Sequence, residues 1–412
     1  MRILWFVNTP FPEMLNHMGL KGDYMGCWMP ALKQALIHLS SFQSGSESKL
    51  GVACGLSDFT NYQEFQKDNV TYFCLPKTRM CEYLQSYRKE LSYCIKVVKD
   101  FDPDIIHVHG TEEFYGLISA CISQPMVISI QGILSVYARV FFGGMRYRDI
   151  LRSPRIIKQY LMMCRKTKTE QRIFRINHYF IGRTIWDQGH LSGLCPDQYA
   201  YYHCDEVMRE AFYENEWCIE ESEPKGIACI SSPYPYKGID SILEALTYLR
   251  RMMPEAVLNI YGSFPPYGYG AFLREKVRKL GLSDHVRFCG FKDSDELAAG
   301  LKKARAFVIA SHVENSANSL QEAMLVGTPA VVSFAGGLPS IAEHEKSCLM
   351  FPRGEPVVMA ECLNRVLSDD QLAVKISEEG KKKARRMNSP ERVAKQLLGI
   401  YRDVIDQGRQ DP

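Results

Sequence analysis

The chain has 412 residues, which is long enough for two domains of ordinary size that each bury their own core. Charged residues make up 24% and apolar residues 46%, as in soluble globular proteins, and the net charge of +3 is too small to indicate nucleic-acid binding. The fourteen cysteines form no C-x-x-C pair, which favours a reducing compartment. Neither a long amino-terminal apolar run nor any apolar run of 18 residues occurs, so we expect a cytoplasmic protein, at most attached to a membrane surface.

The amino-terminal pattern predicts a buried strand over 2–8 and a helix from about 28 to 39. Between them lie Gly19, Gly22 and Gly26, and a glycine-bearing turn lets the backbone approach a ligand closely. A flexible loop explains these glycines equally well. Because G-x-G-x-x-G is absent, the sequence does not favour a dinucleotide cofactor.

The next elements are two strands and a helix, over 49–55, 70–76 and about 81–99. The strand that follows, DIIHVHG (104–110), carries His107 and His109 two residues apart and therefore on one face. This pair could bind a metal, but no third ligand lies nearby in the sequence. Alternatively, one histidine is packed in the core while the other lies at the end of the strand, where α/β proteins bind ligands.

A further strand over 125–132 precedes the most unusual segment, residues 146–175. This segment holds ten Lys or Arg residues and two acidic residues, interleaved with Ile, Leu, Tyr and Met. It predicts either a pair of solvated amphipathic helices or a basic, partly apolar surface that meets anionic lipid or a lipid-diphosphate acceptor. It matches no recognisable nucleic-acid-binding module, so we expect no nucleic-acid partner.

A second α/β series begins after an acidic link over about 204–225, with a strand at 226–232. Lys237 and Gly238 then open a helix, where a cation would lie beside phosphates. Alternating strands and helices continue from there, which predicts a parallel, doubly wound sheet with ligands at the carboxyl ends of its strands.

The stretch from Ser311 to Gly337 carries the strongest functional signal. It follows a buried strand, places Glu314 on a loop and places Glu322 in the first turn of a short helix. The start of such a helix offers free N–H groups and a positive dipole end, which suit a diphosphate. Alternatively, Ser319 and Glu322 form a capping box, which stabilises a helix start without any ligand.

This stretch resembles the E-x7-E signature of retaining glycosyltransferases of the large family four, the glycosyl transferases group 1, in their bacterial surface-polysaccharide branch. The resemblance includes S-x-x-E before the loop, EAM-x-x-G-x-P after it and the pair Gly336-Gly337. It implies an α/β protein with the GT-B fold, in which two Rossmann-like doubly wound domains face a cleft.

The resemblance also implies roles for the site residues. Glu322 would hold the ribose of the donor, and Glu314 would hold the transferred sugar. The diphosphate would lie on Lys237 and on backbone N–H groups of the helix start, those of Asn318, Ser319 and Leu320.

Two further residues are implied on the amino-terminal side, where His109 would face the donor sugar and Gly26 would touch the donor. The family usually has a Gly-Gly pair in this loop, whereas Cys27 follows Gly26 here. The family also pairs the lysine with an arginine six positions earlier, and this chain has Ser231 there. Loss of a bidentate guanidinium requires another cation or weakens donor binding, and Arg274 and Lys276 are candidates to replace it.

We therefore expect an amino-terminal acceptor-side domain over 1–205, with a basic helical insertion over 135–176. A nucleotide-sugar-binding domain over 206–388 would follow. The last helix, over 389–412, would cross back to the first domain, as in similar proteins.

The function implied is that of a retaining hexosyltransferase of surface polysaccharide synthesis (capsule, exopolysaccharide or O-antigen). It would move a hexosyl group from a UDP- or GDP-linked sugar to a glycan or lipid-linked saccharide, without a metal or other cofactor and with front-face attack. Peripheral contact through 146–175 would place it at the inner face of the cytoplasmic membrane. The alternatives are a sugar phosphorylase or epimerase of the same fold, and a nucleotide-sugar-binding partner subunit with little catalysis.

Overall fold

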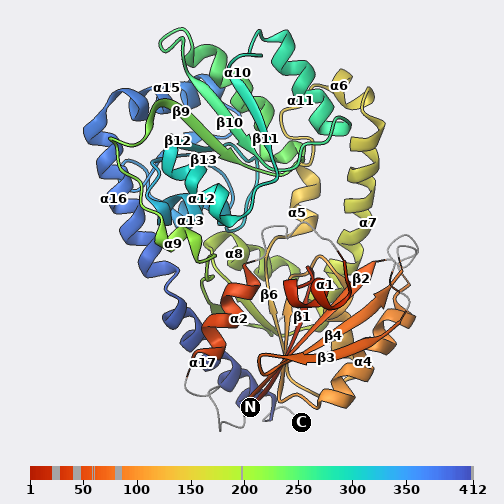
Figure 1. Ribbon diagram of the computed structural model, residues 1–412. Helices are drawn as coiled ribbons and strands as arrows, with labels where there is room; N and C mark the ends of the chain where they lie inside the picture. Colours follow the sequence, from red (N-terminus) through yellow and green to blue (C-terminus); the bar gives the residue numbers. More distant parts are fainter. Residues whose placement is uncertain are drawn as a thin grey trace. The chain divides into compact units, whose positions relative to one another are not determined.

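The structure is a computed structural model, and the residues it describes are 1–20, 28–39, 48–57, 59, 61–78, 86–195 and 198–409. The chain divides into two compact units, each built on its own sheet (Figure 1). Unit 1 consists of Met1–Val136, Met162–Val207 and Pro390–Pro412, and unit 2 consists of Tyr137–Leu161 and Met208–Ser389.

Residues 135–176, predicted as a basic helical insertion of the amino-terminal domain, are divided between the two units. Residues 137–161 group with unit 2, and residues 162–176 group with unit 1. Helices α5 (Leu134–Arg139) and α7 (Pro154–Ile176) each contribute residues to both units, and α6 (Tyr147–Leu151) lies between them in the sequence.

The sheet of unit 1 has eight strands in the order β3-β4-β2-β1-β5-β6-β7-β8. All neighbours are parallel except β3 and β4. The strands are β1 (Arg2–Val7), β2 (Lys49–Ser57), β3 (Gln63–Lys67), β4 (Val70–Lys77), β5 (Ile105–His109), β6 (Met126–Ser129), β7 (Tyr179–Gly182) and β8 (Ala200–His203). The other helices described in unit 1 are α1 (Pro12–His17), α2 (Met29–Ile37), α4 (Arg88–Phe101), the 3₁₀ helix η2 (Phe114–Cys121), α8 (Ile185–Leu194) and α17 (Pro390–Gly408).

Both faces of this sheet are buried. Alternate side chains of β1 enter different cores, with Trp5 in one and Leu4 and Phe6 in the other, as the two-residue period of a strand requires. Such continuous burial explains why the strand reads as an unbroken apolar run in the sequence.

The last helix, α17, completes the core of unit 1. It lies beside α2 (Figure 1), and its Tyr401 hydroxyl accepts a hydrogen bond from Trp5 Nε1 at 2.9 Å. The same hydroxyl lies 2.7 Å from His107 Nδ1. The end of the chain is therefore tied to the two central strands β1 and β5.

The sheet of unit 2 has six parallel strands in the order β11-β10-β9-β12-β13-β14. They are β9 (Glu223–Ile230), β10 (Val257–Tyr261), β11 (Val286–Gly290), β12 (Ala304–Ile309), β13 (Ala330–Phe334) and β14 (Leu349–Pro352). Because the chain builds outward in one direction from β9 and in the other from β12, right-handed crossovers place helices on both faces.

The helices of unit 2 fall into two groups, and the members of each group pack against one another, in accord with this topology. One group contains α10 (Ile239–Leu249), α11 (Gly268–Lys279) and α15 (Pro356–Ser368), and the other contains α9 (Ala211–Glu214), α12 (Ser294–Lys303), α13 (Asn318–Val326) and α16 (Asp370–Met387). The short helices η3 (Pro235–Lys237) and α14 (Leu338–Ile341) follow β9 and β13.

Candidate functional site

The predicted donor residues of unit 2 lie on the two loops that leave the centre of its sheet. The strand order reverses between β9 and β12, and ligands of open α/β sheets bind at such a switch point. Gly238, after β9, has φ of 68°, and a Cβ there would lie 2.1 Å from the Ala310 carbonyl oxygen after β12. Only glycine allows this approach, which explains the Lys237-Gly238 pair.

Lys237 and Glu314 meet at this point. The ammonium group of Lys237 donates to Glu314 Oε1, and the Ser311 hydroxyl donates to the same oxygen at 2.8 Å. Glu314 is buried, whereas the side chain of Lys237 keeps 22% of its exposure. Gly336 lies against the backbone of Glu314, where a Cβ would be 1.9 Å from the carbonyl oxygen, so the Gly-Gly pair supports this loop.

The start of α13 differs from the capping-box alternative. The helix begins at Asn318 with Ala317 as its N-cap, and no side chain of the described residues caps it. Ser319 therefore lies inside the helix, and Glu322 is its fifth residue, too far along to return to the cap. Three backbone N–H groups were predicted to bind the diphosphate. That of Leu320 donates to Ala317 O at 3.1 Å, while Asn318 and Ser319 are the first two residues of the helix.

Glu322 has a partner that the sequence reasoning missed. Arg209, between β8 and α9, donates from Nη2 at 2.7 Å and from Nε at 3.2 Å, both to Glu322 Oε1. Burial raises the pKa of Glu322, and the guanidinium opposes that rise. In the sequence Arg209 stands in the acidic link, where nothing indicates that it pairs with a helix residue far along the chain.

A second missed residue is Tyr137, whose hydroxyl accepts a hydrogen bond from the N–H group of Asn315 at 3.2 Å. Its ring lies 5.3 Å from that of Tyr236, next to Lys237. Further along this segment, a Cβ at Gly143 would lie 2.7 Å from Pro235 O and 2.8 Å from the His312 ring. Residues 137–144 therefore cover part of both switch-point loops.

The candidates to replace the usual arginine are engaged elsewhere. Arg274 lies over the ring of Phe288 at 4.5 Å and donates to Gly270 O. Lys276 pairs with Glu244 and, at 3.7 Å, with an Asp240 oxygen. Ser231 itself follows β9, and its N–H group donates to Tyr261 O at 3.0 Å.

In unit 1, the two histidines of β5 have different surroundings. His107 is fully satisfied, because Nδ1 lies 2.7 Å from the Tyr401 hydroxyl and Nε2 lies 2.7 Å from Ser129 Oγ. Burial lowers its pKa to about 3. Of the two histidines on this strand, His107 is therefore the one packed in the core.

His109 ends β5 at the switch point of the unit 1 sheet, between β1 and β5. It is fully buried, its ring lies 4.7 Å from that of Trp5, and neither ring nitrogen has a hydrogen-bond partner in the part of the chain that the structure describes. Burial, together with the charge of Arg183, lowers its pKa well below the usual value. The imidazole is therefore neutral at physiological pH.

Two carboxyl groups, those of the half-buried Glu112 and the buried Glu170, lie near the end of β5. Glu112 accepts a hydrogen bond from Asn8 at 2.9 Å. Glu170 of α7 accepts hydrogen bonds from the N–H groups of Leu134 and Ser135 at 2.6 and 2.9 Å. Burial raises the pKa of each to about 7. Glu170 thereby caps the start of α5.

Gly26, the predicted donor contact of the first loop, lies outside the described residues, as does Cys27. Across the described ranges, no group of three or more His, Cys, Asp or Glu side chains is arranged to hold a metal ion. No described helix is long and apolar enough to span a membrane.

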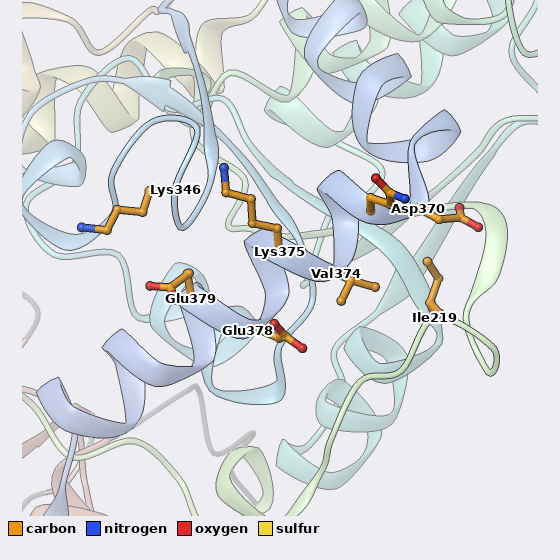
Figure 2. Close-up of a pocket in the computed structure, with 8 residues that line it drawn as sticks. Ile219, Lys346, Asp370, Val374, Lys375, Glu378 and Glu379 are labelled. Carbon is orange, nitrogen blue, oxygen red and sulfur yellow. The ribbon is translucent and has the colours of Figure 1, made fainter.

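A cavity of about 700 Å³ lies elsewhere on unit 2, and Figure 2 shows its lining. It runs along α16, and its charged groups are of both signs, so they favour no one class of ligand. The lining residues are Ile219, Lys346, Asp370, Gln371, Val374, Lys375, Glu378 and Glu379, and none is a predicted donor contact.

Part of the chain that includes these site residues is similar to known proteins. Residues 218–383, which contain Lys237, Glu314 and Glu322, match the family model described as glycosyl transferases group 1. A D-inositol 3-phosphate glycosyltransferase of Corynebacterium urealyticum is 29% identical over 180 residues, which are 43% of this chain and 42% of that protein. The matched part thus spans about two fifths of the length of this curated relative.

Solved structures are similar over nearly the whole chain. Sucrose-phosphate synthase from Thermosynechococcus elongatus has a TM-score of 0.73 at 16% identity, over 99% of this chain and 100% of that one. Anabaena HepE in complex with UDP and glucose has a TM-score of 0.65 at 16% identity, over 97% and 98%. The chain therefore has the GT-B fold, and its residues 218–383 match the model of the glycosyl transferases group 1 family.

Proposed function

We propose that this protein is a retaining glycosyltransferase that moves a hexosyl group from a UDP- or GDP-linked sugar to a saccharide acceptor. The observation that carries the proposal is the meeting of Lys237 and Glu314 at the switch point of unit 2, on the loop that leads into the uncapped start of α13. A lysine and a helix start suit a diphosphate, and a buried carboxylate suits sugar hydroxyls.

In this proposal the nucleotide lies on unit 2, with its ribose on Glu322. The diphosphate replaces Glu314 as the partner of the Lys237 ammonium group. It also accepts hydrogen bonds from the first N–H groups of α13, including those of Asn318 and Ser319. Glu314 is then available to the hydroxyl groups of the transferred sugar. Negative charge that develops on the leaving diphosphate is stabilised by Lys237 and the helix start, which lets the reaction proceed without a metal.

The neutral imidazole of His109 contacts the transferred sugar in this proposal. A buried ring whose two nitrogens have no hydrogen-bond partner among the described residues offers one donor and one acceptor to hydroxyl groups, without adding charge. The acceptor hydroxyl attacks from the side of the leaving diphosphate, and the phosphate oxygen takes its proton.

The test is nucleotide release from a panel of UDP- and GDP-sugars by the purified protein, with and without EDTA. Slow release from one donor that EDTA does not change would support the proposal and name the sugar. Release that EDTA abolishes would contradict metal independence. Nucleotide binding with no release, even with saccharide acceptors present, would favour a donor-binding partner subunit, for which Ser231 in place of the usual arginine is the motivating feature. Release that requires inorganic phosphate would indicate a phosphorylase.

We also propose a lipid-linked acceptor in surface polysaccharide synthesis, reached by contact with an anionic membrane. None of the five residues of α6, all of which the structure describes, is buried, and Tyr147 and Leu151 are 73% and 58% exposed. Arg155 lies over the half-exposed ring of Tyr267 at 4.6 Å. Exposed apolar side chains among arginines are suited to the interface of an anionic bilayer.

Sedimentation with vesicles tests this contact. We expect binding to phosphatidylglycerol vesicles, little binding to phosphatidylcholine vesicles, and a loss of binding in Leu151→Ser together with Arg152→Gln. Met252→Ser, which removes another exposed apolar side chain of unit 2, is the control. Equal binding to both vesicle types, or an unchanged double variant, would contradict the membrane contact.

A further inference from the structure

Among the residues that the structure describes, Arg209 is the cationic side chain that contacts Glu322. It lies outside the E-x7-E stretch, between β8 and α9, and its planar guanidinium contributes two donors to one carboxylate oxygen, Oε1. Its other face lies 4.8 Å from the centre of the Phe212 ring. The side chain is therefore held on two sides, which fixes the direction from which it approaches Glu322.

The carboxylate of Glu322 needs such a partner. Glu322 is 5% exposed, and burial favours the protonated form of a carboxyl group. A guanidinium that bonds Oε1 favours the ionised form and the observed orientation of the group, so Oε2 is left as the oxygen with which a ribose hydroxyl can bond.

The charge of the site points in the same direction. Lys237 is paired with Glu314, so this pair adds no net charge, and Glu322 alone would make the region negative. A nucleoside diphosphate is an anion, and it would be repelled by an unpaired carboxylate next to its ribose. Arg209 balances Glu322, as Lys237 balances Glu314.

We propose that Arg209 is a positioning residue of the nucleotide site, which acts on the bound nucleoside through Glu322. This inference rests on the proposed function, because it assumes that Glu322 holds the ribose. It assigns a ligand-binding purpose to a segment that the sequence places in the interdomain link.

A double-mutant cycle on nucleotide affinity tests this role. Dissociation constants of UDP and GDP would be measured by calorimetry for the wild type, Arg209→Gln, Glu322→Gln and the double variant, with the melting temperature of each. We expect each single variant to weaken binding about tenfold, and the double variant to bind about as weakly as Glu322→Gln alone, because Arg209 acts through Glu322. Arg209→Lys should regain part of the affinity.

The matched control is Arg305→Gln, which breaks another arginine–carboxylate pair of unit 2, that of the buried Arg305 with the exposed Asp370. It should lower the melting temperature and leave the nucleotide affinity unchanged.

Three results would overturn the inference. Arg209→Gln that binds within twofold of the wild type would reduce the pair to a structural role. A double variant whose loss equals the product of the two single losses would show that Arg209 acts independently of Glu322. A wild type that binds neither nucleotide would overturn the proposed function and this inference together.

Discussion

Lys237 and Ser311 both donate to Oε1 of Glu314, so the ammonium group and the carboxylate of the predicted donor site already neutralise each other. An anionic ligand must therefore compete with Glu314 for Lys237. In the proposed function this exchange couples the two residues, since the arrival of a diphosphate on Lys237 would make Glu314 available to a sugar. Substitutions of the two residues should consequently affect different parts of the donor.

Replacing Glu314 by Gln should act mainly on sugar transfer. We expect the rate of nucleotide release to fall about 100-fold, because a buried charged acceptor of sugar hydroxyls is lost. The dissociation constant of the free nucleoside diphosphate should not rise, because in the proposed arrangement Glu314 does not contact that part of the donor and its charge no longer competes for Lys237. Glu378→Gln, in the remote cavity of Figure 2, is the control. A Glu314→Gln variant with near wild-type release would show that the site is misassigned.

Replacing Lys237 by Ala should act on the diphosphate. We expect nucleoside diphosphate binding to weaken by about tenfold or more, the effect of losing one charge-assisted hydrogen bond. Binding of the matching nucleoside, which has no phosphate, should not change. Calorimetry with both ligands separates the two effects, and Lys279→Ala, an exposed lysine on α11, is the control. An equal loss for nucleoside and diphosphate would contradict a phosphate contact.

The hydroxyl of Tyr137 should contribute to donor use through the loop after Glu314. In Tyr137→Phe the N–H group of Asn315 loses its described acceptor, so we expect the loop to be held less firmly and the kcat/KM for the donor to fall about threefold to tenfold. The ring packing on Tyr236 remains, so the melting temperature should change little. Tyr234→Phe tests whether loss of any hydroxyl in this aromatic cluster has the same effect, which would contradict a specific role for Tyr137.

The buried histidines should make unit 1 less stable in acid. His107 and His109 have lowered pKa values in the folded state, so below about pH 6.5 the unfolded chain binds protons that the folded chain does not. Each contributes a loss of about 1.4 kcal/mol per pH unit as the pH falls below that value. Glu112 and Glu170, whose pKa values are raised to about 7, act in the opposite sense between about pH 4.5 and 7.

The difference between variants isolates the contribution of His109. Urea unfolding at pH 7.5 and 5.5 should show that His109→Gln loses less stability on acidification than the wild type does. His178→Gln, which removes an exposed histidine of the same unit, should follow the wild type. A pH dependence of His109→Gln identical to that of the wild type would mean that His109 is protonated in the folded protein.

Local patterns in the sequence were sufficient for much of this structure. Apolar runs predicted the central strands β1, β5, β9 and β12, because side chains of a sheet covered on both faces are buried regardless of partner. The Lys237-Gly238 pair and the spacing of Glu314 and Glu322 predicted loops and a helix start at one sheet edge, and both sets of residues are there. These features depend on backbone geometry within a few residues, which the sequence expresses directly.

The tertiary structure alone decided which groups meet. Arg209 reaches Glu322 across 113 positions, and Tyr137 reaches Asn315 across 178. Ser319 and Glu322 satisfy the spacing of a capping box, yet α13 begins at Asn318 and the carboxylate bonds an arginine instead. A buried charge takes whichever partner the path of the chain brings to it, because the cost of leaving it unpaired exceeds the gain of a local bond at the helix start. That path is set by the packing of whole elements and not by spacing along the chain.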